Sequence, residues 1–166
     1  MSCKSDGKKT GKLYMENNKF LYNNEAIALI SILAILRETK ELEYSKSFLI
    51  LPFLLNDNIV NFIRRKNSIV IGIQDLISRR IENFSNFNKS FKNFTPLTFN
   101  TLLLGHELGV LKLNPNYIEL SDNETFDFES KILGNRVENI LTASKKLIPI
   151  FEKDSAELYS SLKIIL

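Results

Sequence analysis

The segment covering residues 94–120 restricts the possible folds of this chain more than any other. Residues 95–108 place leucines along one helical face, and Gly109 suits a helix C-terminus because glycine adopts left-handed backbone angles easily. Two short alternating segments, 110–113 and 117–120, then flank an Asn-Pro-Asn sequence that is typical of turns. Together with long helical patterns on both sides, this segment predicts a mainly α fold with one small β-hairpin.

Helices plus one small hairpin are the parts of a winged-helix-like helical domain. We expect the helix before the hairpin to begin with Thr95 as its cap and Pro96 at its first position. Residues 95–108 contain no Lys or Arg. A helix that binds DNA needs cations for the phosphates and polar side chains for the base edges. The sequence therefore predicts a winged-helix-like shape whose primary partner is protein and not DNA.

Length and composition predict a single domain. The chain has 166 residues and 44% hydrophobic content, which is enough for one core. Residues 1–13 are polar and basic, so we expect a disordered N-terminal tail, and residues 14–166 are expected to form the single helical domain. A net charge of +3, from 22 basic and 19 acidic residues, is too mild for a dedicated DNA-binding protein.

Apolar runs and cysteine content predict a cytoplasmic protein that does not span a membrane. The longest apolar runs, 26–36 and 48–55, are shorter than the roughly 20 residues that a membrane-spanning helix needs. Residues 1–12 lack the apolar segment of a secretory signal. Cys3 is the only cysteine, so the chain has no internal disulfide, which fits a reducing compartment.

The first half of the chain predicts several helices. Residues 26–36 are apolar on nearly every helical face, which predicts a helix that is buried all round. The polar residues 39–46 are expected to form a connection. Residues 48–55 predict a second apolar helix, interrupted by Pro52, and residues 59–66 predict a short third helix.

Residues 67–81 allow two interpretations. Apolar residues recur at helical spacing from Ile69 to Ile81, which predicts a helix that starts at residue 67 or 68. Val70 and Ile71 are β-branched, which favours a strand instead.

An aromatic stripe follows. Spacings of three and four place its rings on one helical face, which favours core packing. A stacking platform for single-stranded nucleic acid is the alternative, but such platforms carry more cations than are present here. The rings are Phe84, Phe87, Phe91 and Phe94, and the interspersed cations are Lys89 and Lys92.

The last third of the chain predicts two further helices. Residues 126–150 have helical periodicity, and Gly134 within them suggests a close contact with another helix. Asp154 or Ser155 is expected to cap a final helix that runs to the end of the chain.

Catalytic chemistry has few candidate residues. With one histidine and one cysteine, the chain lacks the ligands of a Cys/His zinc site. It has no glycine-rich loop of the kind that holds phosphates, and its carboxylates show no paired spacing. His106, on a leucine-rich helix, is the most plausible single catalytic side chain, and a packing role suits it better. We therefore expect no catalytic residue, no metal, no cofactor and no enzymatic activity.

Two candidate contact regions remain. The basic clusters are read as solvated helix ends or as one patch that touches DNA backbone or an acidic partner. The patch would comprise Arg64, Arg65, Lys66, Arg79, Arg80, Lys89 and Lys92. The chain also ends in apolar residues, so we expect its last helix to pack on the core or on a partner. The candidate partner-binding residues of that helix are Leu158, Tyr159, Leu162 and Ile165.

Several segments, in this order and spacing, resemble a known family. They are Asn-Glu-Ala-Ile-Ala-Leu at 24–29, Phe-Leu-Ile-Leu-Pro-Phe-Leu-Leu at 48–55, Phe-Thr-Pro-Leu at 94–97 and Leu-Gly-His-Glu-Leu-Gly-Val-Leu-Lys-Leu at 104–113. They resemble the middle components of bacterial three-component ABC ATPase systems, the group that includes the Lamassu antiphage and antiplasmid systems. Residues 56–59 and 163–166 depart from the family pattern, so no contact is transferred to them.

The resemblance implies a non-enzymatic accessory or scaffold subunit. Its partners would be a coiled-coil ABC ATPase of the SMC type and an effector, often a nuclease, and DNA would be reached through the complex. The alternative is a stand-alone winged-helix DNA-binding regulator. The cation-free helix and the mild net charge disfavour that alternative.

Overall fold

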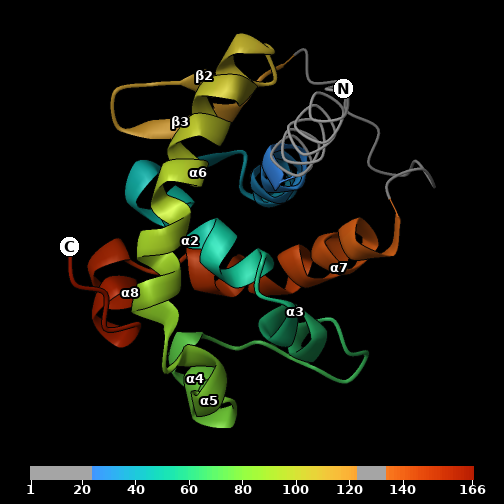
Figure 1. Cartoon of the computed structure of the whole chain (residues 1–166), viewed down its shortest axis with the longest axis vertical. Coiled ribbons are helices and arrows are strands. Elements are labelled where there is room, and N and C mark those ends of the chain that lie inside the picture. The colour runs from blue at the N-terminus through green and yellow to red at the C-terminus, as the bar shows by residue number, and fades with distance from the viewer. Residues whose placement is uncertain (1–23, 123–133) are drawn as a thin grey trace, which may run out of the picture.

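The computed structural model describes residues 24–122 and 134–166. The tail expected at residues 1–13 and part of the helix expected at 126–150 lie outside the described residues. The fold is mainly helical with a small antiparallel sheet, which confirms the predicted fold class (Figure 1). The elements are a helical stretch at residues 24–39, β1 (Glu41–Glu43), α2 (Tyr44–Leu54), α3 (Asp57–Ile63), α4 (Ile73–Arg79), α5 (Ile81–Phe84), α6 (Phe87–Glu107), β2 (Leu111–Leu113), β3 (Tyr117–Leu120), α7 (Gly134–Phe151) and α8 (Ser155–Ser161).

The sheet has a third strand that the sequence did not predict. The segment expected to be a connection contains β1, which pairs antiparallel with β3, so that the strand order is β1-β3-β2. β1 alternates between exposed glutamates and the buried Leu42, and Leu42 lies opposite Ile118. A three-residue strand with two charged ends is too short to show a clear alternation in sequence. Its partner lies about 75 residues further along the chain, and this pairing makes α2 begin at Tyr44 rather than near Phe48.

The core lies between the helical residues 24–39, α2, α6 and α7. The predicted all-round burial of the first helix is confirmed over residues 28–36. Phe53 of α2 lies at the centre of an aromatic cluster, with ring centroids 6.1 Å from Phe84, 4.8 Å from Phe87 and 6.2 Å from Phe151. The aromatic stripe therefore packs into the core, as the preferred interpretation predicted, and is not available to stack on nucleic acid bases.

Helix α6 is longer than the sequence predicted. It runs without interruption from Phe87 to Glu107 with Pro96 inside it, so the helix start expected at Thr95 is wrong. The Thr95 hydroxyl does not cap the helix: it donates a 2.8 Å hydrogen bond backwards to the carbonyl of Phe91. Pro96 lies on the exposed side, where a missing amide donor is tolerated because water can reach the backbone.

The end of α6 matches the sequence. Gly109 has φ +72°, and its N–H donates to the His106 carbonyl at 2.9 Å, as expected for a helix C-terminus. Gly105, in the preceding turn of α6, packs against the sheet. A Cβ atom on Gly105 would lie 2.5 Å from a terminal carbon of Leu111 and 2.9 Å from one of Leu29. Glycine at this position lets α6 approach both β2 and the first helix closely.

The segment between α3 and α4 is neither helix nor paired strand. Residues 69–72 form no regular secondary structure, Gly72 is extended with φ 178° and ψ 177°, and α4 begins only at Ile73. The expected helix start at residue 67 or 68 is therefore wrong. The β-branched residues favour the extended backbone, as the strand interpretation held, but no strand pairs with them in the described part of the chain.

The C-terminal helices pack back on the core. The Asp154 side chain accepts hydrogen bonds from the Ala156 and Glu157 amides at 2.9 and 3.2 Å, which confirms it as the cap of α8. Gly134 has φ +77° and open space around it, so the predicted close helix contact is wrong. The final helix ends at Ser161 and not at the last residue.

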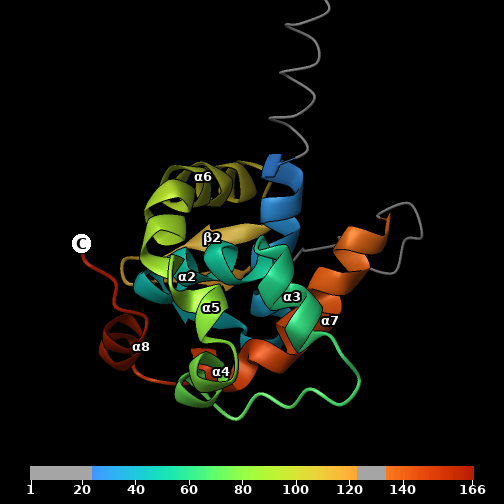
Figure 2. The same ribbon diagram turned by 60° about the horizontal axis from the view of Figure 1, so that its bottom comes forward.

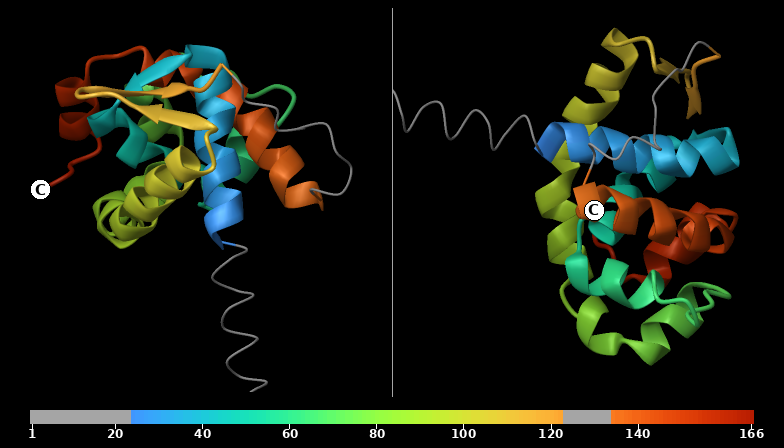
Figure 3. Two further views of the ribbon diagram at one scale, coloured as in Figure 1. Left: turned by 90° about the horizontal axis from the view of Figure 1, so that it is seen from above. Right: turned by 90° about the vertical axis from the view of Figure 1, so that its right-hand side faces the viewer.

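The molecule is elongated, with the sheet at one end and the helices α4 and α5 at the other (Figure 1). Views from other sides show the strands lying beside the C-terminal half of α6 (Figure 3). Among the described helices, none is both long enough and apolar enough to cross a membrane.

Candidate partner-binding surfaces

Three arginines from the two predicted basic clusters come together on one aromatic ring. The guanidinium carbons lie 5.8 Å (Arg65), 5.6 Å (Arg79) and 4.7 Å (Arg80) from the centre of the Phe62 ring. These distances are within the range of cation–π attraction. We call these four residues the arginine cluster. The sequence allowed the cations to form one patch as an alternative to solvated helix ends, but nothing in it indicated that three of them would meet on Phe62.

The cations of the predicted patch differ in what surrounds them. Arg79 pairs with Asp75, and Arg80 pairs with Glu82 at 3.4 Å. Arg64 donates to the side-chain oxygen of Asn61 at 2.9 Å. Within residues 24–122 and 134–166, no carboxylate pairs with Arg64, Arg65 or Lys66. Lys89 and Lys92 are exposed on the first half of α6, and the described contacts do not connect them to the arginine cluster.

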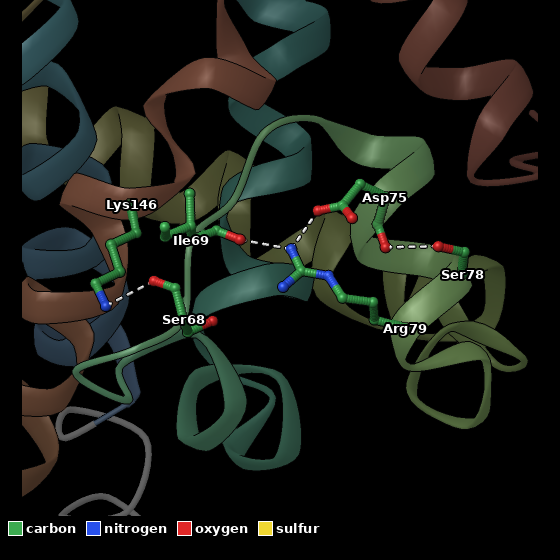
Figure 4. A network of polar contacts seen from close by, with 6 residues as sticks. All are labelled: Ser68, Ile69, Asp75, Ser78, Arg79 and Lys146. Carbon is green, nitrogen blue, oxygen red and sulfur yellow. Dashed lines mark hydrogen bonds and ion pairs between the residues drawn. The ribbon is translucent and has the colours of Figure 1, made fainter.

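A lysine that the sequence did not single out organises the loop after α3. Lys146 of α7 donates to the backbone oxygens of Arg65 at 2.6 Å and Ser68 at 2.9 Å. On the other side of the loop, Arg79 donates to the Ile69 carbonyl and also reaches Asp75 (Figure 4). Lys146 lies about 80 residues away from the loop in sequence, so no local pattern could have identified it.

The same loop presents apolar side chains to solvent. Ile69 is 70% exposed and Ile71 is 73% exposed, whereas Val70 between them is only 6% exposed. This alternation is what an extended backbone produces when one of its sides faces the core. We call residues 69–71 the isoleucine loop.

A second apolar surface lies on α6. Phe99 is 56% exposed and Leu103, one turn later, is 43% exposed; Leu108 follows at 61%. Leu108 lies on the opposite side of the helix from Phe99, because nine residues correspond to two and a half turns, so we call only Phe99 and Leu103 the α6 face. His106 is exposed beside them, with its Nδ1 atom 3.3 Å from the Leu111 carbonyl oxygen. The α6 face is uncharged, as residues 95–108 led us to expect.

The predicted partner-binding helix belongs mostly to the core of this chain. Leu158 and Leu162 are buried, and the Tyr159 hydroxyl donates to the Ser45 carbonyl at 2.8 Å. The partly buried Tyr159 ring also meets Phe91 edge-on, at 5.6 Å between ring centroids. Of the four residues, only Ile165 is exposed. A partner at this end can therefore reach Ile165 but not the two leucines.

Two electrostatic features complete the surface. Beside β1, a hollow of about 480 Å³ is lined by Glu38, Glu41, Glu43 and Glu152 together with Lys46, which pairs with Glu43 at 3.2 Å. Nearby, Lys112 donates to Asp122 at 2.6 Å, and this exposed pairing raises the pKa of Lys112 and lowers the pKa of Asp122. No group of three or more His, Cys, Asp or Glu residues in the described ranges is arranged to hold a metal ion.

Of three comparisons with known proteins, one gives a match. Searches of curated proteins and of solved structures give no match. A family model describing the ABC-three component (ABC-3C) system Middle Component 3 matches residues 24–166, nearly the whole chain. This match confirms the resemblance to middle components that the sequence segments indicated. The chain belongs to the Middle Component 3 family of ABC-three component systems.

Proposed function

We propose that this middle component is a non-enzymatic scaffold that connects an SMC-type coiled-coil ABC ATPase to an effector, such as a nuclease. It would act in the cytoplasm in defence against phages or plasmids, as in Lamassu systems. DNA would be met through the complex rather than by this chain alone. Family membership supports the place of the chain in a three-component system. The surfaces described above support a role in binding proteins.

The observation that carries this proposal is the α6 face. Phe99 and Leu103 are large apolar side chains, one turn apart on the same side of α6, that stay exposed in the isolated chain. Contiguous exposed apolar surface is typical of protein-binding sites, because burying it against a partner is favourable. Residues 93–107 carry no Lys or Arg, so this stretch of α6 lacks the cations that would hold DNA phosphates.

The absence of a catalytic role is part of the proposal. The exposed His106 has a backbone carbonyl as its described partner, at 3.3 Å, and not a carboxylate or a nucleophile. A general base needs a substrate proton within reach and a group that orients its ring. A scaffold needs neither, and His106 here adds a hydrogen bond that joins the end of α6 to β2.

The test is co-purification of the chain with the ATPase and effector encoded in the same system. Phe99→Glu and Leu103→Glu place a charge on the α6 face and should lower the yield of at least one partner about tenfold or more, as for a central interface residue. Asn100→Glu, an exposed change on the same helix, is the matched control and should leave the yield unchanged.

Two results would contradict the proposal. One is full co-purification by the Phe99→Glu and Leu103→Glu variants. The other is tight, sequence-specific DNA binding by the isolated chain, which would support the stand-alone regulator instead.

A further inference from the structure

The isoleucine loop has the geometry of a preformed peptide-binding edge. Ile69 and Ile71 are exposed and Val70 between them is buried, the alternation of an extended backbone with both isoleucines on its outward side. The loop between α3 and α4 runs along the outer edge of the molecule (Figure 2). In the described part of the chain, no hydrogen bond engages the backbone groups of Val70 or Ile71. Such groups are available to an added extended segment.

The loop is held in place before any partner binds. Lys146 holds the Ser68 carbonyl at 2.9 Å from the α7 side, and Arg79 holds the Ile69 carbonyl from the α4 side (Figure 4). These cations come from two different helices and bond to successive residues on opposite sides of the backbone. A loop that is already ordered loses little conformational entropy on binding. More of the free energy gained by burying its exposed side chains therefore appears as affinity.

The charge beside the loop points to an acidic occupant. Arg64, Arg65 and Lys66 are exposed next to the loop, and among the described residues none of them pairs with a carboxylate. Arg79 and Arg80 are already compensated by Asp75 and Glu82. Three cations without a described carboxylate partner thus precede the isoleucine loop in sequence, and Lys146, which bonds the Ser68 carbonyl, adds a fourth.

We propose that the isoleucine loop and Arg64–Lys66 bind an extended segment of another component of the system, in which apolar residues alternate with Asp or Glu. The apolar residues would pack on Ile69 and Ile71, and the carboxylates would face the three cations. The inference rests on the proposed scaffold function, since it takes the occupant to be a partner protein.

Nucleic acid fits this surface less well. Phosphates gain nothing from two exposed isoleucines. The aromatic ring at the site, Phe62, already has three guanidinium groups within 6 Å of its centre, and a base would have to compete with them for the ring. Contact with DNA is therefore the outcome that would contradict the proposal.

Photocrosslinking in cells that express the whole system tests the proposal. A photoreactive amino acid replaces Ile71 in the full chain, and the same amino acid at the exposed Lys153 is the control. The Ile71 position should crosslink to a peptide of the ATPase or effector with an excess of Asp and Glu, at least several-fold more than the control. Crosslinks to DNA, or no more crosslinking than at Lys153, would overturn it.

Charge reversal supplies the second measurement. Arg64→Glu with Lys66→Glu should reduce partner binding about tenfold or more. Replacement of the Asp and Glu residues of the crosslinked peptide by Lys should restore binding. Lys145→Glu with Lys153→Glu, at two exposed positions outside the candidate patch, changes the net charge equally and should have little effect. An equal loss in both double variants would contradict the proposal.

Failure of the two proposals can be told apart. If the wild-type chain assembles with its partners but Ile71 gives no specific crosslink, only the docking site is wrong. If the wild-type chain does not assemble at all, the scaffold function is wrong as well.

Discussion

The Nζ atom of Lys146 lies 2.9 Å from the backbone oxygen of Ser68, although 78 residues separate them. A second bond from the same atom reaches the Arg65 carbonyl at 2.6 Å. One side chain of α7 thus satisfies two backbone acceptors in the loop that follows α3. This contact connects the two halves of the chain at the place where the arginine cluster and the isoleucine loop meet.

Removal of the Lys146 ammonium should loosen this loop. Lys146→Met keeps the apolar stem but leaves two carbonyls without their charged donor, which should cost about 1–3 kcal/mol in the free energy of unfolding. Hydrogen exchange of residues 65–72 should become faster. Lys145→Met, at the exposed neighbouring position, is the matched control and should change neither quantity. Equal effects of the two substitutions in urea unfolding and hydrogen exchange would show that the contact does not hold the loop.

Gly105→Ala should destabilise the fold. In an unobstructed helix, alanine would be more favourable than glycine by about 1 kcal/mol. Here its Cβ atom would lie within 3 Å of side-chain carbons of Leu111 and Leu29, and overpacking of this kind costs about 1–3 kcal/mol. Asn100→Ala, at an exposed position of α6, gains helix propensity without a clash and serves as control. A Gly105→Ala variant with a midpoint of urea unfolding at or above that of wild type would refute the close packing.

Tyr159→Phe should reduce stability and change its pH dependence. Loss of the 2.8 Å hydrogen bond to Ser45 should cost about 1 kcal/mol at neutral pH. Burial raises the pKa of Tyr159 above its ordinary value, because the ionised phenol is poorly solvated there. The contribution of the Tyr159 hydroxyl to the free energy of unfolding is therefore fully present below the unfolded-state pKa, near 10. It is lost as the pH rises through the folded-state pKa.

Urea unfolding at pH 8 and near pH 11 measures both effects. The stability difference between wild type and Tyr159→Phe should narrow at the higher pH. A difference that stays constant or widens would mean that the hydroxyl is not held neutral in the fold.

His106→Gln should leave the biological output nearly intact. A catalytic general base at this position would contribute about 10²–10⁴-fold in rate, whereas a side chain that only bonds a carbonyl is replaceable. Complex assembly and defence activity are to be measured side by side in the same cells. Normal assembly with abolished activity would reopen a catalytic role for this residue.

The parts of the fold that the sequence predicted depend on local signals. The buried first helix follows from apolar residues on all faces, and Gly109 and Asp154 end and start helices through their own backbone or side-chain chemistry. The parts that it missed depend on distant partners. β1 is a strand because β3 offers it an edge, and α6 passes through Pro96 because its aromatic stripe is buried against α2.

The candidate site shows the same division. The basic clusters were visible in the sequence as runs of Arg and Lys, but the meeting of three arginines on Phe62 depends on how the chain after α3 returns to that ring. The isoleucine loop had the β-branched residues of a strand and the spacing of a helix, and neither pattern alone predicted an unpaired extended segment. Leu158 and Leu162 appeared available to a partner because sequence does not distinguish a helix that covers its own core from one that meets another chain.

The most direct test of the scaffold function is whether this chain is needed to hold the other two components together. The effector carries an affinity tag in cells that express the complete system, and the recovered ATPase is quantified with and without this chain. We predict recovery of the ATPase with the wild-type chain, and a loss of about tenfold or more without it or with the Phe99→Glu and Leu103→Glu changes. Equal recovery of the ATPase in the absence of the chain would contradict the account.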